Sequence, residues 1–294
     1  MARITTSGPW AHGTDAAFRA WLAEFFAMMT GCGLVQTADS GQINPATATW
    51  PGVNSTDAGF GVWRFNDSLQ SVAPVFIKVA FGRGNSTANA RGTLQVGTGS
   101  DGAGNITGLA TDAHVMNGSA ASAGPFDSYA IHREGLAAMA FKVGGSAGTI
   151  PLTFIVQRTV DNSGTPTGEG LHILRPAINY TSPAQVARLR FTPTAEATTF
   201  ASIALAPVAF VPGGLVDGRV GLSPQVFPHW TVTPKQRPLL FSASNIRGEI
   251  ATGQQFSMAL VGSVASNYIS LGTAFGNTLI GTPSHSDLSL FWDD

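Results

Sequence analysis

The stretch GFGVWRFNDSLQSVAPVFIKVAF, residues 59–81, decides the fold class of this chain. Residues 60–65 and 74–81 are rich in Val, Ile, Phe and Trp with an alternating pattern, which is typical of β-strands. Four apolar residues of the second run fall on one face, namely Val75, Ile77, Val79 and Phe81. Asn66 and Asp67 lie where a turn should connect the two runs. We therefore expect an antiparallel strand pair that is central to a sheet.

Upstream of this pair, the sequence predicts one helix. Between Phe18 and Met29, apolar residues recur at intervals of three and four, which is helical spacing. Thr14 and Asp15 precede the run as start signals, and glycines at positions 31 and 33 can end it. The wide aromatic stripe must cover a large surface, either the chain's own sheet or a partner subunit.

Downstream of the pair, short apolar runs separated by turn residues continue toward the C-terminus. Further strands are predicted at residues 93–97, 128–132, 136–143, 150–160, 172–174, 186–191, 203–211, 238–242, 256–261 and 268–271. Residues 161–170, DNSGTPTGEG, have the composition of a hairpin turn. This pattern predicts a mainly β chain, an antiparallel β-sandwich or jelly-roll-like domain with one N-terminal α-helix. We expect an arm and amphipathic helix over residues 1–40, and a β-rich domain over residues 41–294, as one unit or two packed subdomains.

Charged side chains are scarce in the sequence. Only 11% of the 294 residues are Asp, Glu, Lys or Arg, and the formal net charge is -1, whereas about 25% is ordinary for a soluble domain. Little electrostatic repulsion therefore keeps copies apart, which favours assembly. A second interpretation stays open, because Gly-, Thr- and Ser-rich β proteins can cover their surfaces with hydroxyls and amides instead.

The single cysteine and the apolar segments indicate whether the protein is exported or inserted into a membrane. Cys32 is the one cysteine, so it cannot form an intrachain disulfide. The first apolar stretch is interrupted by Arg19 and Glu24, unlike a signal peptide. The later apolar stretch at residues 201–212 is short and contains proline, unlike a membrane span. We expect a soluble, unexported protein with no membrane span.

Two glycine motifs match known signatures but lack the required context. Residues 97–102, GTGSDG, fit G-x-G-x-x-G, yet residues 103–108, AGNITG, cannot open the helix that a phosphate cradle needs. Residues 144–148, GGSAG, fit the G-x-S-x-G nucleophile elbow, yet residues 149–155 have the composition of a strand rather than a helix. Both motifs are therefore interpreted as turns.

The remaining polar residues predict no catalytic, cofactor-binding or metal site. No metal-ligand spacing occurs among the histidines, at positions 12, 114, 132, 172, 229 and 285. Four acids stand far apart in the sequence, so only folding could bring two of them together as the carboxylate pair of a glycosidase. They are Glu134, Glu169, Glu196 and Glu249. The C-terminal polar residues are interpreted as solvated: His285, Asp287, Asp293 and Asp294. Nucleic-acid binding is not expected, because basic residues are scattered and Arg188 with Arg190 is the densest arginine pair.

Residues 59–82, with LQVGTGSDGAGN at residues 94–105, resemble a segment recurrent in virion structural proteins of tailed bacteriophages, usually tail or baseplate components. The resemblance is weak toward the C-terminus and includes no catalytic residues. It implies a non-enzymatic virion subunit, made in the host cytoplasm, that forms a symmetric homo-oligomer in the tail, baseplate, neck or head and contacts other virion proteins there. The glycine-rich loop 97–108 would then lie at a subunit contact or a host-facing tip.

An alternative interpretation gives the subunit a recognition role. It would bind a host-surface receptor or glycan from the tail tip or fibre. Sugar faces stack on aromatic rings, and the candidate rings are Tyr180, Trp230 and Trp292. A hydrolytic enzyme of the virion is the third interpretation, although we expect no catalysis.

Overall fold

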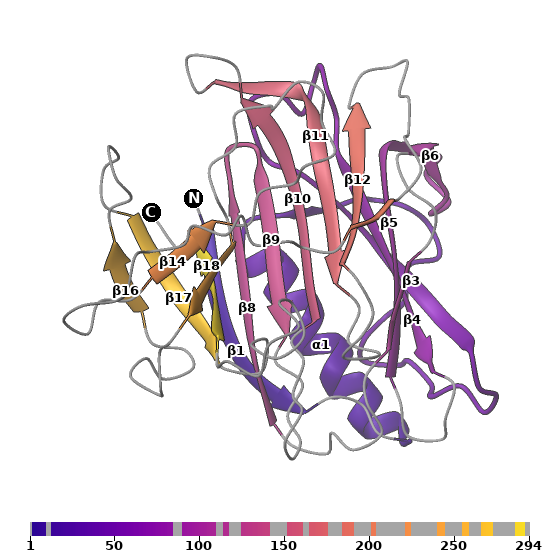
Figure 1. The fold of residues 1–294 in the computed structure, drawn as a ribbon. Coiled ribbons are helices and arrows are strands. Elements are labelled where there is room, and N and C mark those ends of the chain that lie inside the picture. The colour runs from indigo at the N-terminus through magenta and orange to yellow at the C-terminus, as the bar shows by residue number, and fades with distance from the viewer. Residues whose placement is uncertain are drawn as a thin grey trace.

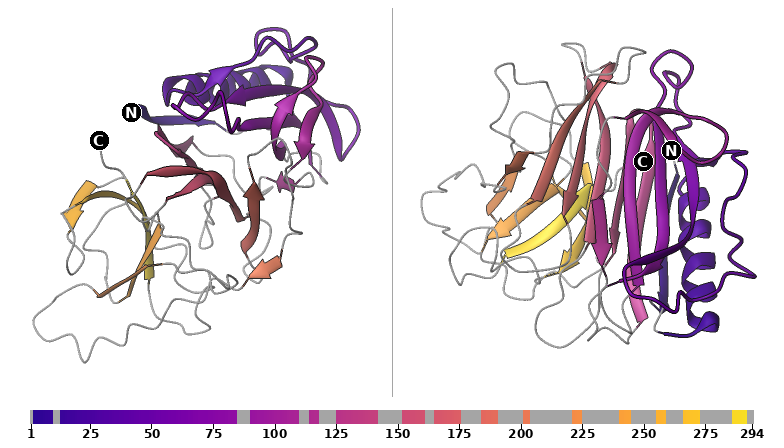
Figure 2. Two further views of the ribbon diagram at one scale, coloured as in Figure 1. Left: turned by 90° about the horizontal axis from the view of Figure 1, so that it is seen from above. Right: turned by 90° about the vertical axis from the view of Figure 1, so that its right-hand side faces the viewer.

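The structure is a computed structural model that confirms a mainly β, antiparallel chain with one N-terminal helix. The described residues are 2–9, 13–84, 90–109, 114–117, 125–141, 152–160, 165–175, 184–190, 201–203, 221–224, 240–244, 255–258, 266–272 and 286–291. Helix α1 (Asp15–Gly31) lies at one side of the molecule, and the C-terminal strands lie at the opposite side (Figure 1, Figure 2). Among the described residues, no helix is long and apolar enough to cross a membrane.

The described strands form three antiparallel sheets. The first has the order β2 (Val35–Gln36), β3 (Thr56–Arg64), β4 (Phe76–Arg83), β5 (Ala90–Ser100) and β6 (Ile106–Leu109), with β7 (His114–Asn117) also paired to β5. The second has the order β1 (Ala2–Pro9), β8 (Pro125–Arg133), β9 (Leu136–Phe141), β10 (Leu152–Val160), β11 (Pro166–Arg175), β12 (Ala184–Arg190) and β13 (Ala201–Ile203). The third has the order β14 (Gly221–Pro224), β15 (Leu240–Ser244), β18 (Ser286–Phe291), β17 (Ser266–Gly272) and β16 (Gln255–Met258).

The strand pair predicted from residues 59–81 is confirmed as β3 and β4, interior strands of the first sheet. All four residues of the predicted apolar face are fully buried: Val75, Ile77, Val79 and Phe81. The connection is slightly longer than predicted, because β3 ends at Arg64 rather than residue 65 and β4 begins at Phe76 rather than residue 74. Residues 65–75 therefore form a loop long enough to build a site.

Most of the other predicted strands overlap observed ones. Matches occur in β5, β8, β9, β10, β11, β12, β15, β16 and β17. The strand predicted at 203–211 is described only at residue 203, which ends β13, and residues 166–170 of the predicted hairpin turn belong to β11. Residues 2–9, expected as an arm, form strand β1, which pairs with β8 along its whole length. The expected N-terminal arm is thus part of the second sheet.

Helix α1 begins where the sequence predicts, and it packs on its own chain. The Thr14 side chain accepts a hydrogen bond from the Ala17 backbone N–H at 3.2 Å, which caps the first turn. Its buried side chains are Phe18, Trp21, Leu22, Phe25, Met28 and Met29. The Phe25 ring lies edge-on to Phe81 of β4, with centroids 5.0 Å apart. The aromatic stripe therefore covers the first sheet rather than a partner subunit.

One hydrophobic core joins the helix to both of the first two sheets. The second sheet contributes four small or flexible side chains: Ala130, Ala137, Met139 and Val156. Cys32, at the end of α1, belongs to the same core. The core therefore crosses the expected boundary between residues 40 and 41, and the two sheets share it as layers of a sandwich do. A further β subdomain in the C-terminal part stays a prediction.

Candidate functional site

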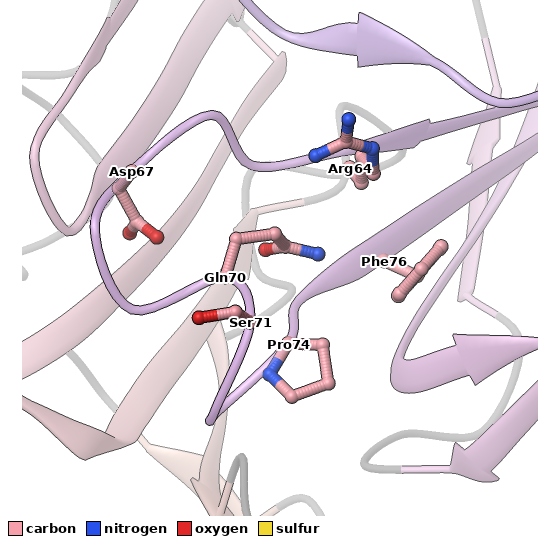
Figure 3. A pocket seen from close by; sticks show the side chains of 6 residues that line it. All are labelled: Arg64, Asp67, Gln70, Ser71, Pro74 and Phe76. Carbon is pink, nitrogen blue, oxygen red and sulfur yellow. The ribbon is translucent and has the colours of Figure 1, made fainter.

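The loop between β3 and β4 borders a pocket of about 380 Å³ that is open to solvent. Six residues line it: Arg64, Asp67, Gln70, Ser71, Pro74 and Phe76 (Figure 3). Arg64 ends β3, Phe76 begins β4, and the sheet register places them directly opposite each other. Side chains alternate along a strand, so this pair lies on the face away from the core residues Trp63 and Ile77.

Hydrogen bonds within the loop hold its two ends together. The Gln70 side chain accepts from the Val75 backbone N–H at 3.0 Å and donates to the Val75 carbonyl at 3.3 Å. The Phe65 N–H also donates to that carbonyl, at 3.1 Å. Within the loop, the Ala73 N–H donates to the Leu69 carbonyl at 2.8 Å. These bonds therefore hold the loop in one conformation as a wall of the pocket.

A buried ion pair attaches the loop to the second sheet. Both Asp67 carboxylate oxygens accept from the Arg158 guanidinium of β10, at 2.8 and 3.1 Å, and both side chains are fully buried. The Gly135 N–H, in the turn between β8 and β9, donates to Asp67 at 3.3 Å. The Gly135 carbonyl accepts from the Arg158 N–H at 2.7 Å. Bidentate geometry and added donors are what a buried ion pair requires.

His132 lies beside this ion pair as a neutral acceptor. Its Nε2 accepts from the Asn66 backbone N–H at 3.4 Å, and its ring lies edge-on to Phe65 with centroids 5.4 Å apart. Burial lowers the pKa of His132 to about 4, and the Asp67 charge opposes this only in part. The imidazole is therefore uncharged at neutral pH and carries its proton on Nδ1. We call Asp67, Arg158 and His132 the buried polar cluster.

Glu134 makes a second attachment, at the exposed edge of the buried polar cluster. Its carboxylate accepts from the Ser68 backbone N–H at 3.0 Å and also from the Ser68 hydroxyl. Sequence reasoning treated Glu134 as an isolated acid and His132 as an unassigned histidine. The fold brings both to the loop 65–75, where each side chain accepts a hydrogen bond from a loop backbone N–H and so helps to hold the loop in place.

The glycine motif at residues 97–102 lies in a hairpin, as predicted: residues 97–100 end strand β5, and residues 101–105 connect it to β6. In this connection, Asp101 accepts from the backbone N–H groups of Ala103 and Asn105 at 2.8 and 3.0 Å. These bonds, with one from the Asn105 side chain, lower the pKa of Asp101. Gly104 has φ +84° and lies so close to the Phe60 ring that a Cβ would overlap it. Contacts within the chain therefore order this loop.

Several predicted positions lie outside the described residues or side chains. They are the G-x-S-x-G segment 144–148, His12, His114, His172, His229, His285, Glu169, Glu196, Glu249, Asp287, Asp293, Asp294, Arg188, Arg190, Tyr180, Trp230 and Trp292. Cys32 is described and buried, and burial raises the pKa of its thiol to about 12, so it stays protonated at neutral pH. In the described part of the chain, no group of three His, Cys, Asp or Glu residues could hold a metal ion.

Sequence reasoning missed the pocket and the buried polar cluster. Arg64 stands between two aromatic residues, and Arg158 lies in the apolar strand LTFIVQRTV. A cation within an apolar strand could have indicated such a site from the sequence, because its charge needs either a buried acidic partner or a position on the outward face of the sheet. In the structure, Arg158 has a buried acidic partner, and Arg64 lies on the outward face.

Comparisons with protein-family models, with curated proteins and with solved structures gave no match. The case for a function therefore rests on the composition of the chain, its fold and its pocket. In chemical terms, the pocket offers a guanidinium, a hydroxyl and two apolar rings, from Arg64, Ser71, Phe76 and Pro74. Such groups suit binding and orientation of a ligand.

Proposed function

We propose that this chain is a non-enzymatic structural subunit of a tailed-phage virion, which forms a symmetric homo-oligomer and contacts other virion proteins. The observation that carries the proposal is the scarcity of charge, 11% of residues with a formal net charge of -1. A surface with so few ions has little to oppose contact with neighbours. The resemblance of residues 59–82 and 94–105 to virion proteins supplies the setting.

The use of the described carboxylates supports a structural role. Asp67 binds Arg158, Asp15 accepts from the Trp50 backbone N–H at 2.8 Å, and Asp39 accepts from the Gly104 N–H at 2.9 Å. Each of these bonds fixes one segment of the chain on another. Acidic groups thus hold loops in place, which suits a rigid particle component.

An available sheet edge supports assembly. Strand β1 lies at the end of the second sheet and, among the described strands, pairs only with β8. Its residues 2–9, ARITTSGP, include one charged side chain, Arg3. Edge strands with few charges are natural sites for pairing with another chain. Such pairing would continue the sheet from one subunit into the next.

Light scattering on the purified chain, from low to high micromolar concentration, tests this proposal. We expect one defined oligomer, because the charge-poor surface favours self-association. A monomer throughout that range would overturn the oligomer. Mass spectrometry and antibody labelling of purified phage particles test the virion assignment, and absence of the chain from intact particles would overturn it.

A second candidate function is recognition of a host-surface receptor or glycan, and the pocket favours it. Receptor-binding components need an accessible site with both polar and apolar groups, and the loop 65–75 forms one. Repetition of a weak site in an oligomer would raise its avidity. The two functions are compatible, since one particle component can both assemble and bind.

A further inference from the structure

We propose that the pocket beside the loop 65–75 binds a carboxylate-bearing sugar, with Arg64 as its anion-binding group. This inference rests on the second proposed function and names its ligand class. It is carried by one juxtaposition: the Arg64 guanidinium, which has no carboxylate within ion-pair distance among the described residues, lies on the strand opposite Phe76, and both side chains line the pocket (Figure 3).

The charge around the pocket favours an anion. Arg64 makes one long hydrogen bond, from Nη1 to the Phe65 carbonyl at 3.4 Å. Among the described residues, no carboxylate lies within ion-pair distance of Arg64, and the Asp67 charge is already neutralised by Arg158. The guanidinium therefore keeps donors for a ligand, and its planar fork matches a carboxylate in a bidentate manner.

A second cation extends this positive face. The register pairs Val62 with Lys78 and Arg64 with Phe76, so Lys78 is two residues from Phe76 on the same side of β4. Its Nζ lies 4.7 Å from the centroid of the Phe60 ring, and it has no ion pair with any described carboxylate. Two acids lie at this loop, and both are engaged: Asp67 is paired with Arg158, and Glu134 is bonded to Ser68. The outward face of β3 and β4 thus has two unneutralised cations.

The rings at the pocket favour a sugar over a bare inorganic anion. Phe76 and Pro74 are both half-buried and both line the pocket, as Figure 3 shows. The apolar face of a sugar ring packs on such surfaces, while its carboxylate and hydroxyls can bind Arg64 and Ser71. The volume of about 380 Å³ falls within the range of about 300–1,000 Å³ for small-molecule sites.

Hydrogen bonds and a buried ion pair hold the loop that borders the pocket. Gln70 fixes both ends of the loop at Val75, and Asp67 fixes its middle to Arg158. A preformed site loses less conformational entropy when the ligand binds. An open site of this size still binds one sugar weakly, so function would depend on several copies per particle.

The first test compares matched ligands on the unmodified protein by isothermal titration calorimetry. The probes are trigalacturonic acid with its carboxyl-reduced counterpart, and sialyllactose with lactose. We expect the acidic member of at least one pair to bind about tenfold or more tightly than its neutral partner, as a charge-assisted bidentate contact implies. Equal affinities within both pairs, or no binding of either acid, would overturn the proposal. Inorganic phosphate binding as tightly as the acidic sugar would also overturn it.

The second test uses variants at the pocket. Arg64→Gln should lower acidic-sugar affinity at least about tenfold and leave the neutral sugar unchanged, whereas Phe76→Ala should weaken both. The matched control is Arg19→Gln, which removes the same charge from helix α1 and should not alter binding. Thermal unfolding checks that each variant is folded. An Arg64→Gln protein that is folded and binds the acidic sugar normally would overturn the proposal.

Whole-cell adsorption separates failure of the pocket from failure of the proposed function. We expect the unmodified protein to bind host cells, and Arg64→Gln to bind them at least about tenfold more weakly. Equal binding by both proteins would overturn the pocket while supporting recognition. No binding of the unmodified oligomer to host cells would overturn recognition itself, and light scattering on the same samples tests assembly independently.

Discussion

The aromatic core under helix α1 and the buried polar cluster behind the loop 65–75 both join distant parts of the chain, but by different physics. In the core, rings from α1 pack on Trp63 and Phe81, at centroid distances of 4.9 to 6.1 Å. In the cluster, one carboxylate meets one guanidinium with both fully buried. Apolar burial is non-directional and adds up over many contacts. A buried ion pair stabilises only while both partners are present.

The difference predicts how each region responds to change. Loss of a core ring leaves a cavity whose cost depends on buried volume. Loss of one partner in the cluster leaves an uncompensated charge, which a second substitution can remove. The cluster should also depend on pH, because it contains His132, whereas the aromatic core should not.

The largest effect is expected for Trp63→Ala in the aromatic core. Trp63 is fully buried and contacts Phe25, Phe26 and Phe81, so its truncation should lower the free energy of unfolding by about 5 kcal/mol. Urea unfolding measures this change. Val53→Ala is the control, because that side chain is 69% exposed and should cost less than about 0.5 kcal/mol. A loss below about 1 kcal/mol at Trp63 would contradict the packing described.

The next effect is expected for Arg158→Met in the buried polar cluster. It should cost about 4 kcal/mol in urea unfolding, because Asp67 is left buried without its partner. Adding Asp67→Leu should recover most of that loss, since two apolar side chains then replace the pair. Arg91→Met, at the more exposed pair with Asp57, should cost less than about 1 kcal/mol. If the two substitutions instead lowered the free energy of unfolding additively, the ion pair would not be what attaches the loop 65–75 to β10.

Acid should destabilise the cluster through His132. In the unfolded chain the imidazole gains a proton below its ordinary pKa of 6.5, whereas burial lowers the pKa in the folded protein to about 4. The contribution of neutral His132 to the free energy of unfolding is therefore complete above about pH 6.5. It is lost as the pH falls to about 4, which lowers the free energy of unfolding by about 3 kcal/mol. Unfolding at several pH values measures it. His132→Gln keeps an acceptor for Asn66 without titrating, so its profile should be flatter, and identical profiles would contradict the assignment.

The smallest effect is expected at the start of helix α1. Thr14→Ala removes the cap on the Ala17 N–H and should cost about 1 kcal/mol. Thr30→Ala is the matched control: the Thr30 hydroxyl bonds only to carbonyls of its own helix, and alanine has the higher helix propensity. Thermal unfolding that ranks the two variants in the opposite order would contradict the cap.

Local patterns predicted much of the N-terminal half. Thr14, the aromatic spacing from Phe18 and the alternation at Val75 to Phe81 all act through neighbours in sequence, and each appears in the structure as expected. Asn66 and Asp67 were expected as turn residues between the two strands, and no side-chain partner was predicted for Asp67. Asp67 instead binds Arg158, 91 residues later. The pairing of residues 2–9 with β8 was missed for the same reason, since a strand edge is completed by a remote segment.

The sequence by itself determined the class of the protein: a mainly β chain with few charges and one aromatic helix near its start. Periodicity and capping are short-range properties, so they can be read without a fold. Only the tertiary structure decided that the helix covers its own sheet, that His132 and Glu134 hold a loop, and that Arg64 lines a pocket and has no ion-pair partner among the described carboxylates. Those outcomes depend on which distant side chains meet and on how far water is excluded there, and short-range sequence patterns record neither.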